Sequence, residues 1–293
     1  VAIVVLQIWG SYRLIVKIFK WLSLSLFAYV IAAFLAKPDW YAVATATFIP
    51  PIRLSSEYIT TIVAILGTTI SPYLFFWEAS EEVEDEKSEG RTKLTQRLGA
   101  TDAEIKREKI DTIVGMVFCN VVFYFVILAA GATLHVSGKT DIQSATDAAQ
   151  ALRPLAGDLA TVLFAIGLIG AGLLAVPVLT GSAAYAVAET FSWPSGLDEK
   201  PRHAKKFYAV IAVSTLVGVL IDFVGINPIK ALFWTAVING VVAPPLLVVV
   251  MLVANNKRVM GDRVNGTFAN IVGWLATAVM FIAAIAMFIT WGN

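Results

Sequence analysis

The chain has 293 residues, of which 58% are hydrophobic and 15% charged, and its formal net charge is +1. Because soluble domains carry about a quarter charged residues, this composition excludes an ordinary soluble domain. The near-neutral net charge argues against a nucleic-acid partner. Several uncharged apolar runs approach or exceed the roughly 20 residues that cross a bilayer core. Backbone groups in lipid must be hydrogen-bonded internally, so these runs predict an all-α transmembrane protein in a lipid bilayer. The clearest runs are Met116–Leu134, Leu159–Ala188, Trp234–Asn255 and Phe268–Trp291.

The N-terminal part of the chain predicts one incomplete and one complete membrane helix. The apolar run Val1–Gly10 is too short to span a bilayer, and we interpret it as the tail of a truncated helix. The stretch Leu14–Ala36 is long enough to span, and it ends at a turn containing Pro38 and an interfacial tryptophan, Trp40. A polar loop is then expected to run to about Glu57.

The next predicted helix starts near Tyr58, is interrupted at Ser71-Pro72 and resumes at Tyr73. The charged segment Glu78–Lys109 should be aqueous, and its Thr101-x-x-Glu104 pattern is a capping box that predicts the start of another helix. That helix leads into the first long apolar run. The following spans and loops are expected in this order: loop His135–Arg153, span Leu159–Ala188, loop Glu189–Lys206, span Phe207–Phe223, a helix starting at Asn227-Pro228, loop Asn255–Gly266 and span Phe268–Trp291.

The positive charges are distributed unevenly between the two predicted sides of the membrane. Most of the 22 Lys and Arg residues lie on one side. Because cytoplasmic loops retain positive charge, that side is expected to be cytoplasmic and the C-terminus outside, in a bacterial cytoplasmic membrane. The opposite side holds only Lys37, Arg53, Lys139, Arg153 and Lys230.

The interrupted helix is the most informative segment. Pro72 has no amide hydrogen and clashes with the preceding turn, and Gly67 is a weak helix former, so together they predict a break in mid-span. Broken helices build ion and substrate sites in secondary transporters. The hydroxyl groups of Thr68, Thr69 and Ser71 suit hard cations. From the break alone, a kinked helix without a ligand is the alternative.

An acidic stretch follows the break. Glu78 lies roughly 9 Å beyond Pro72 along a helix, and an ionisable residue within the membrane is a functional candidate. The carboxylates after it are interpreted as a solvated cytoplasmic face, with a funnel that concentrates cations as the alternative. They are Glu81, Glu82, Glu84, Asp85 and Glu86.

The segment Gly67–Tyr73 resembles the sixth-helix break of the NRAMP divalent-metal transporters, whose pattern is Ala-x-x-Met-Pro-His. Other stretches resemble the family in the same order along the chain, from the end of the fourth helix through the eleventh. They are Gly10–Arg13, Lys37–Trp40, Phe118–Asn120, Leu163–Leu168, Gly181–Glu189 and Asn255–Gly261.

The resemblance implies a LeuT-type fold with two inverted five-helix repeats. Residues 1–293 would then be one integral membrane domain that holds the second repeat and lacks the first three helices, including the Asp-Pro-Gly-Asn metal ligands of the first helix. By the same resemblance, the Thr68 carbonyl and Ser71 stand in the positions of metal ligands in the family. Asn120 and Asn239 are further candidate ligands, and a helix–helix hydrogen bond is the alternative for Asn120.

The sequence departs from the family at positions that matter for chemistry. Ser71 replaces a methionine, and a hydroxyl favours harder ions such as Mg²⁺ or Mn²⁺ where a thioether favours soft metals. Tyr73 and Glu78 stand where the family has histidines associated with proton transport. Glu78 therefore either takes over a proton-relay role, or the coupling to protons is lost.

These observations predict a secondary transporter that moves a divalent metal cation by alternating access. The cation is its substrate, no cofactor is expected, and protons are a candidate coupled ion. A LeuT-fold transporter of another solute and a cation channel are the alternatives. An enzyme is not expected, because the sequence has no HExxH, GxSxG or histidine cluster and contains only 2 histidines.

Overall fold

The computed structural model describes residues 12–135, 138, 142, 144, 146, 149 and 153–291, and its regular elements are all helical within that part of the chain. The run Val1–Gly10, interpreted above as a helix tail, lies outside the described residues. So does most of the predicted loop His135–Arg153. The chain divides into two compact units, each considered by itself here. Unit 1 comprises residues 1–48 and 76–229, and unit 2 comprises residues 49–75 and 230–293.

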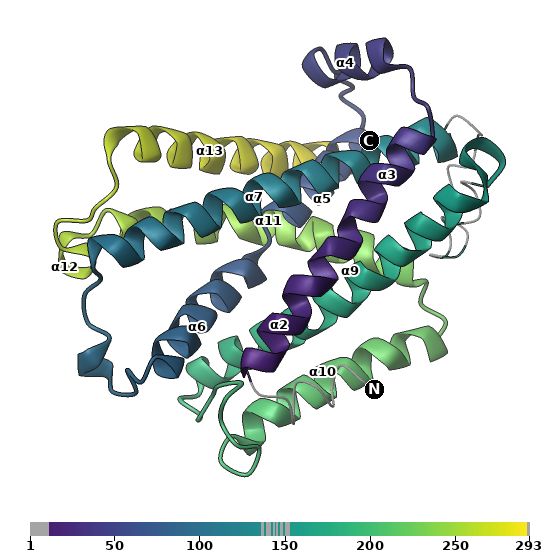
Figure 1. Ribbon diagram of the computed structural model, residues 1–293. Coiled ribbons are helices and arrows are strands. Elements are labelled where there is room, and N and C mark those ends of the chain that lie inside the picture. Colours follow the sequence, from purple (N-terminus) through teal and green to yellow (C-terminus); the bar gives the residue numbers. More distant parts are fainter. Residues whose placement is uncertain are drawn as a thin grey trace. The chain divides into compact units, whose positions relative to one another are not determined.

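Unit 1 is a helical body in which α3 packs along α9, and α10 packs on the opposite end of α9 (Figure 1). Its inner contacts include an edge-on pair of rings, Tyr29 and Phe164, with centroids 5.2 Å apart. Its elements are α2 (Tyr12–Leu22), η1 (Ser23–Leu26), α3 (Phe27–Leu35), α4 (Trp40–Phe48), most of α6 (Pro72–Ser88), η2 (Leu94–Gln96), α7 (Asp102–Ala130), η3 (Gly131–His135), α9 (Arg153–Thr190) and α10 (Lys205–Phe223).

Unit 2 is built on α5 (Ser56–Thr69), which packs against α11 (Pro228–Ala254) and α13 (Thr267–Thr290). Met287 of α13 is 1% exposed and fills the space beside Val63 and Val237. The start of α6 and the short helix α12 (Lys257–Met260) complete the unit.

Six helical stretches in the described part of the chain are long and apolar enough to cross a membrane, judged by length and composition. They confirm all but one of the complete spans that the sequence predicts. The stretch predicted at Phe207–Phe223 is helical as α10, but it is not among the six. The six are Lys17–Leu35, Ser56–Ser88, Asp102–His135, Gly157–Thr190, Pro228–Ala254 and Thr267–Thr290.

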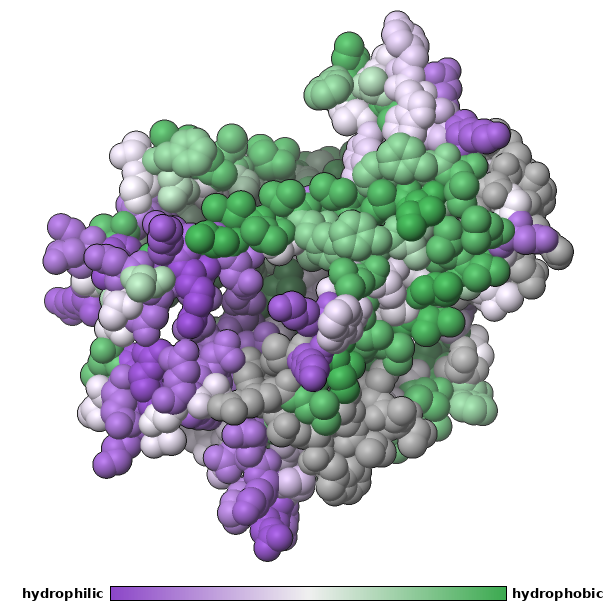
Figure 2. All heavy atoms as spheres, viewed as in Figure 1, coloured by the Kyte–Doolittle hydropathy of each residue, from purple (hydrophilic) through white to green (hydrophobic). Residues whose placement is uncertain are grey.

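The outer surfaces of these helices suit a lipid environment. On α7 the side chains of Ile113, Val117 and Ile127 are exposed, and on α3 so is Phe34. Figure 2 shows hydrophobic atoms over α3 and the later part of α7, and hydrophilic atoms around the connection from α6 to α7 and the start of α7. Contiguous exposed apolar surface of this kind marks a membrane or partner contact. The chain is therefore an integral membrane protein by its helices and by their surfaces.

Two predicted loops contain short helices instead. The segment expected to be a polar loop up to Glu57 holds α4, because the Asp39 carboxylate accepts hydrogen bonds from the amides of Tyr41 (2.9 Å) and Ala42 (3.2 Å). The loop Asn255–Gly266 holds α12, which the Asn256 side chain caps by accepting from the Arg258 amide. Side-chain caps of this kind stabilise a helix start even where the following segment is short.

Local signals at helix starts are confirmed where the sequence contained them. The capping box is present: the Thr101 hydroxyl accepts from the Glu104 amide, and the Glu104 carboxylate accepts from the Thr101 amide at 2.6 Å. Pro228 is the first residue of α11, where a missing amide hydrogen costs nothing.

Candidate functional site

The predicted helix break is confirmed between α5 and α6. Helix α5 ends at Thr69, Ile70 has non-helical dihedrals (φ −120°, ψ 75°), and α6 begins at Pro72. Pro72 donates no backbone hydrogen bond to the preceding turn, so the ladder of α5 cannot continue through it. The break lies inside the candidate span Ser56–Ser88.

Hydroxyl groups take over the carbonyls that the break frees. Ser71 is only 2% exposed, and its hydroxyl donates to the Gly67 carbonyl at 2.6 Å, with the Thr68 carbonyl 3.3 Å away. The Thr68 hydroxyl donates to the Ile65 carbonyl at 2.7 Å. A hydroxyl has one proton and two lone pairs. When the hydroxyl donates its proton to a carbonyl, the lone pairs of its oxygen stay available. A cation can bind to these lone pairs.

The break is held by close packing of α5 on α11 within unit 2. A Cβ added to Gly67 would collide with the Ala236 carbonyl and the Gly240 backbone, and one added to Gly240 would collide with the Val63 carbonyl. Only glycine permits this approach of two helix backbones. Asn239, a predicted ligand, is the residue before Gly240 and is partly buried. Asn239 therefore lies in α11 next to the point where this helix contacts α5 near the break.

The other predicted site residues belong to helices α6 and α7. Asn120 is exposed on α7 of unit 1, and its amide nitrogen donates to the Met116 carbonyl of its own helix at 2.7 Å. Tyr73 is partly buried in the first turn of α6. Glu78 lies in the part of α6 that belongs to unit 1. Their roles as ligand or relay stay predictions.

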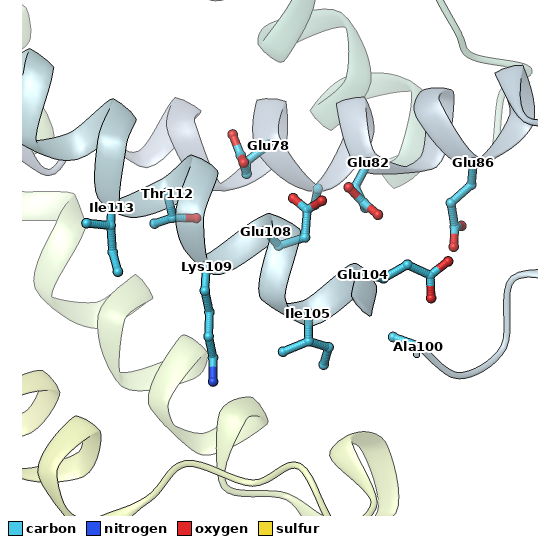
Figure 3. A pocket seen from close by; sticks show the side chains of 11 residues that line it. Glu78, Glu82, Glu86, Ala100, Glu104, Ile105, Glu108, Lys109, Thr112 and Ile113 are labelled. Carbon is cyan, nitrogen blue, oxygen red and sulfur yellow. The ribbon is translucent and has the colours of Figure 1, made fainter. Parts of the chain in front are cut away.

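Unit 1 contains an acidic groove between α6 and α7, with a volume of about 520 Å³. Glutamates of both helices line it, and the side chains of Glu82 and Glu86 extend toward those of Glu104 and Glu108 (Figure 3). Lys109 also lines the groove, but its ammonium group points away from the carboxylates (Figure 3). The glutamates of the groove are Glu78, Glu82, Glu86, Glu104 and Glu108.

Salt bridges compensate part of the negative charge of the groove, including one of 3.1 Å between Arg107 and Glu108. Arg91 pairs with Glu104 at 2.9 Å and with Glu86 at 3.2 Å. It also donates a 2.7 Å hydrogen bond to Glu89, which holds the pKa of that exposed carboxyl below its ordinary value. Among the described residues, Glu78 and Glu82 form no salt bridge. The unpaired charge is thus at the end of the groove nearer the start of α6.

Sequence reasoning missed the α7 side of this groove. The sequence pattern assigns Glu104 to the capping box alone and assigns no separate role to Glu108. The signal was present in the spacing: Glu78, Glu82 and Glu86 recur every four residues, as do Glu104 and Glu108, and residues four apart share one helix face.

The interpretation of the acidic run as a solvated face is wrong for Glu84. That residue is 3% exposed and pairs with Lys87 at 3.2 Å. Gly196 lets a loop approach it, since a Cβ there would lie 2.7 Å from the Glu84 carboxylate oxygen. Burial of this carboxylate is possible because Lys87 compensates its charge. Glu84 is therefore a packing residue and not part of the groove.

The described residues contain no group of three or more His, Cys, Asp or Glu side chains that could hold a metal ion. The ligands that the described residues offer at the break are neutral oxygens of carbonyl, hydroxyl and amide groups. Such ligands suit hard cations that keep part of their hydration shell.

Broken apolar helices with oxygen ligands at the break build ion sites in secondary transporters. The sequence matches the family model described as "Natural resistance-associated macrophage protein-like" over residues 1–290. The chain belongs to this family, which confirms the resemblance found at Gly67–Tyr73.

Curated relatives agree with this assignment. The chain is 28% identical over 266 residues to "Divalent metal cation transporter MntH" of Clostridium acetobutylicum, covering 90% of this chain and 57% of that protein. Proteins of the same name from Caldanaerobacter subterraneus (26% over 290 residues; 99% and 64%) and Bacillus subtilis (27% over 288 residues; 96% and 62%) are also similar. The chain thus spans 57–64% of the length of these relatives. Their names denote transporters, in agreement with the expectation that the chain is not an enzyme.

Proposed function

We propose that this chain forms part of a secondary transporter that moves a divalent metal cation across the cytoplasmic membrane by alternating access. The observation that carries the proposal is the break between α5 and α6, where carbonyl and hydroxyl oxygens converge inside an apolar span. Family membership and the names of the relatives support the same substrate class.

The cation is bound by the Thr68 carbonyl and the Ser71 hydroxyl, with Asn239 as an additional amide ligand, and Asn120 stays a candidate ligand through the family resemblance alone. The Ser71 hydroxyl is buried, and its proton is already donated to the Gly67 carbonyl. Its oxygen is therefore oriented as an acceptor before a cation arrives. Neutral oxygens favour Mg²⁺ or Mn²⁺ over softer metals, and Mg²⁺ in particular retains bound water in such sites.

The acidic groove supplies the cation to the pathway or receives it. Unpaired carboxylates in a hollow raise the local concentration of cations, and Glu78 and Glu82 are the unpaired pair. Tyr73 and Glu78 lie on α6 after the break, where Glu78 is the candidate carrier of a coupled proton. The distribution of the 22 Lys and Arg residues supports a cytoplasmic location for the groove and an outside location for the C-terminus.

The test is uptake of Mn²⁺ into proteoliposomes that contain the whole protein, compared with Ser71→Ala and Thr69→Ala. Both variants lose one hydroxyl that is bonded to a carbonyl of the same break. We expect Ser71→Ala to lower uptake at limiting Mn²⁺ by about 10-fold and Thr69→Ala to lower it less than twofold.

Equal effects of the two variants would remove Ser71 from the site. If the protein took up an organic solute and divalent cations did not compete, the substrate would be that solute and not a divalent metal. Fluxes far above transporter turnover would indicate a cation channel.

A further inference from the structure

A cationic pocket lies in the loop between α9 and α10, and none of its residues lines the acidic groove. Its volume is about 270 Å³. The ring of Trp193 and three cationic side chains are among the groups that line it. The cationic residues are Arg202, Lys205 and Lys206.

The cations of this pocket have no carboxylate partners in the described part of the chain. Arg202, Lys205 and Lys206 form no salt bridge there. Asp198 and Glu199 precede them in the same loop but pair with none of them. Lys206 instead places its ammonium group 4.6 Å from the centroid of the Trp193 ring, a cation–π contact that leaves its charge uncompensated.

The loop that carries these cations is fixed by buried contacts. The Tyr185 hydroxyl accepts a hydrogen bond from the Leu197 amide at 3.1 Å, and the Tyr208 hydroxyl donates to the Glu199 carbonyl at 2.8 Å. Phe207 and Ala204 are 0% and 1% exposed and anchor the start of α10 in the core. Like charges are therefore held near one another before any ligand binds, and such preorganisation reduces the ordering cost of binding.

Backbone groups at the start of α10 add to the attraction for an anion. The residue before the first turn, Ala204, provides no side-chain cap. The first amides of a helix have no partner within the helix, and such a terminus attracts phosphate. Here the terminus is one side of a cationic cavity, so the two effects act on the same space.

The pocket also follows directly on the end of a candidate membrane span. The candidate span in α9 ends at Thr190, three residues before Trp193. Phe191 and Trp193 are stacked with their centroids 5.1 Å apart. Aromatic side chains are enriched at the membrane–water boundary, and basic residues just beyond a span bind anionic headgroups.

We propose that this pocket binds the phosphate group of an anionic phospholipid, such as the phosphodiester of phosphatidylglycerol. Arg202 and Lys205 contact the phosphate oxygens, and Lys206 and Trp193 form the wall toward the membrane. A free phosphate ion shares this chemistry, but the position of the pocket at the end of a span favours a phosphate carried by a lipid.

The test is native mass spectrometry of the whole protein, titrated with phosphatidylglycerol and, separately, with phosphatidylcholine of the same acyl chains. The variant Arg202→Gln/Lys205→Gln removes two pocket charges and leaves the Lys206–Trp193 contact. Lys257→Gln/Arg258→Gln removes two charges from the exposed helix α12 and is the matched control. We expect the pocket variant to bind phosphatidylglycerol at least about 10-fold more weakly and the control to change it less than twofold.

Further arms separate the sources of the phosphate. Wild-type protein should prefer phosphatidylglycerol to phosphatidylcholine, and millimolar inorganic phosphate should not displace the lipid. Equal binding of both lipids, equal losses in the two variants, or full displacement by inorganic phosphate would each overturn the proposal. These lipid-binding outcomes are independent of whether the protein transports a metal.

Discussion

The helix break and the acidic groove offer a cation two opposite kinds of environment. At the break, Ser71 is buried and its oxygen is neutral, and its proton is committed to the Gly67 carbonyl. In the groove, Glu78 and Glu82 carry charge that no described basic residue pairs with. Neutral, fixed oxygens discriminate between ions by size and hydration. Exposed carboxylates attract any cation, and salt screens that attraction.

We therefore expect the break to select the ion and the groove to concentrate it. Each region has a structural basis for its expected role. The break depends on backbone geometry, which the contact between Gly67 and Gly240 fixes. The groove depends on charge count, which Arg91 reduces at one end. Mutations in the break should therefore alter which ion is moved or whether any is moved. Mutations in the groove should alter how much ion is needed, and loss of Glu78 should in addition remove the candidate proton carrier.

The largest effect is expected from Gly67→Ala. The added methyl group would collide with the Ala236 carbonyl and the Gly240 backbone, which cannot move aside as a flexible side chain can. We expect a loss of about 1–3 kcal/mol in stability and loss of most transport. Thermal unfolding of the whole protein in detergent, together with Mn²⁺ uptake, measures both.

The matched control for that variant is Gly115→Ala on α7, where an added Cβ meets nothing within 4 Å. It should be neutral or slightly stabilising because alanine is the better helix former. If Gly67→Ala were as harmless as Gly115→Ala, the close approach of α5 and α11 would not hold the break.

A smaller effect is expected from Glu78→Gln/Glu82→Gln. Removing the unpaired charge should raise the KM for Mn²⁺ by about 3- to 10-fold at low ionic strength, and the difference should shrink as salt is added. The preference among metals should stay unchanged. Concentration-dependent uptake at two salt concentrations measures this.

Glu189→Gln/Asp262→Asn is the control for the groove, since both carboxylates are exposed and lie outside it. A change in ion preference on neutralising Glu78 and Glu82 would contradict the division of roles, because it would place a selecting ligand in the groove.

The smallest effect is expected from Thr101→Ala at the start of α7. It removes the hydroxyl that accepts from the Glu104 amide at 3.2 Å, at a cost of about 1 kcal/mol. The melting temperature should fall by a few degrees while uptake is retained, and Thr101→Ser should restore stability. Loss of uptake without a change in melting temperature would show that Thr101 has a role beyond the cap.

Much of the fold follows from local patterns in the sequence. Length and lack of charge located the spans, Pro72 located the break, and Thr101 with Glu104 located the start of α7. The helices α4 and α12 were missed because their stability comes from single caps, Asp39 and Asn256, in segments that otherwise appear as loops.

The site was less predictable because it depends on contacts between distant segments. Ser71 and Thr68 were found from the break itself. The groove required Glu104 and Glu108 to face α6, and the burial of Glu84 required a glycine of a distant loop at position 196. Nothing in the local sequence around Glu84 distinguishes it from its exposed neighbours.

The most direct test of the central claim is competitive uptake of Mg²⁺ and Mn²⁺ by the whole protein in proteoliposomes, with internal pH recorded. Wild type is compared with Ser71→Met and with Ser71→Cys, which adds a soft sulfur at nearly constant volume. Both variants carry Cys119→Ser, which removes the one cysteine of the given sequence. The account predicts that wild type carries Mg²⁺ as well as Mn²⁺ and that both sulfur variants shift preference toward Mn²⁺ and softer metals. An unchanged Mn²⁺/Mg²⁺ ratio in both variants would contradict the role of Ser71 as the selecting ligand.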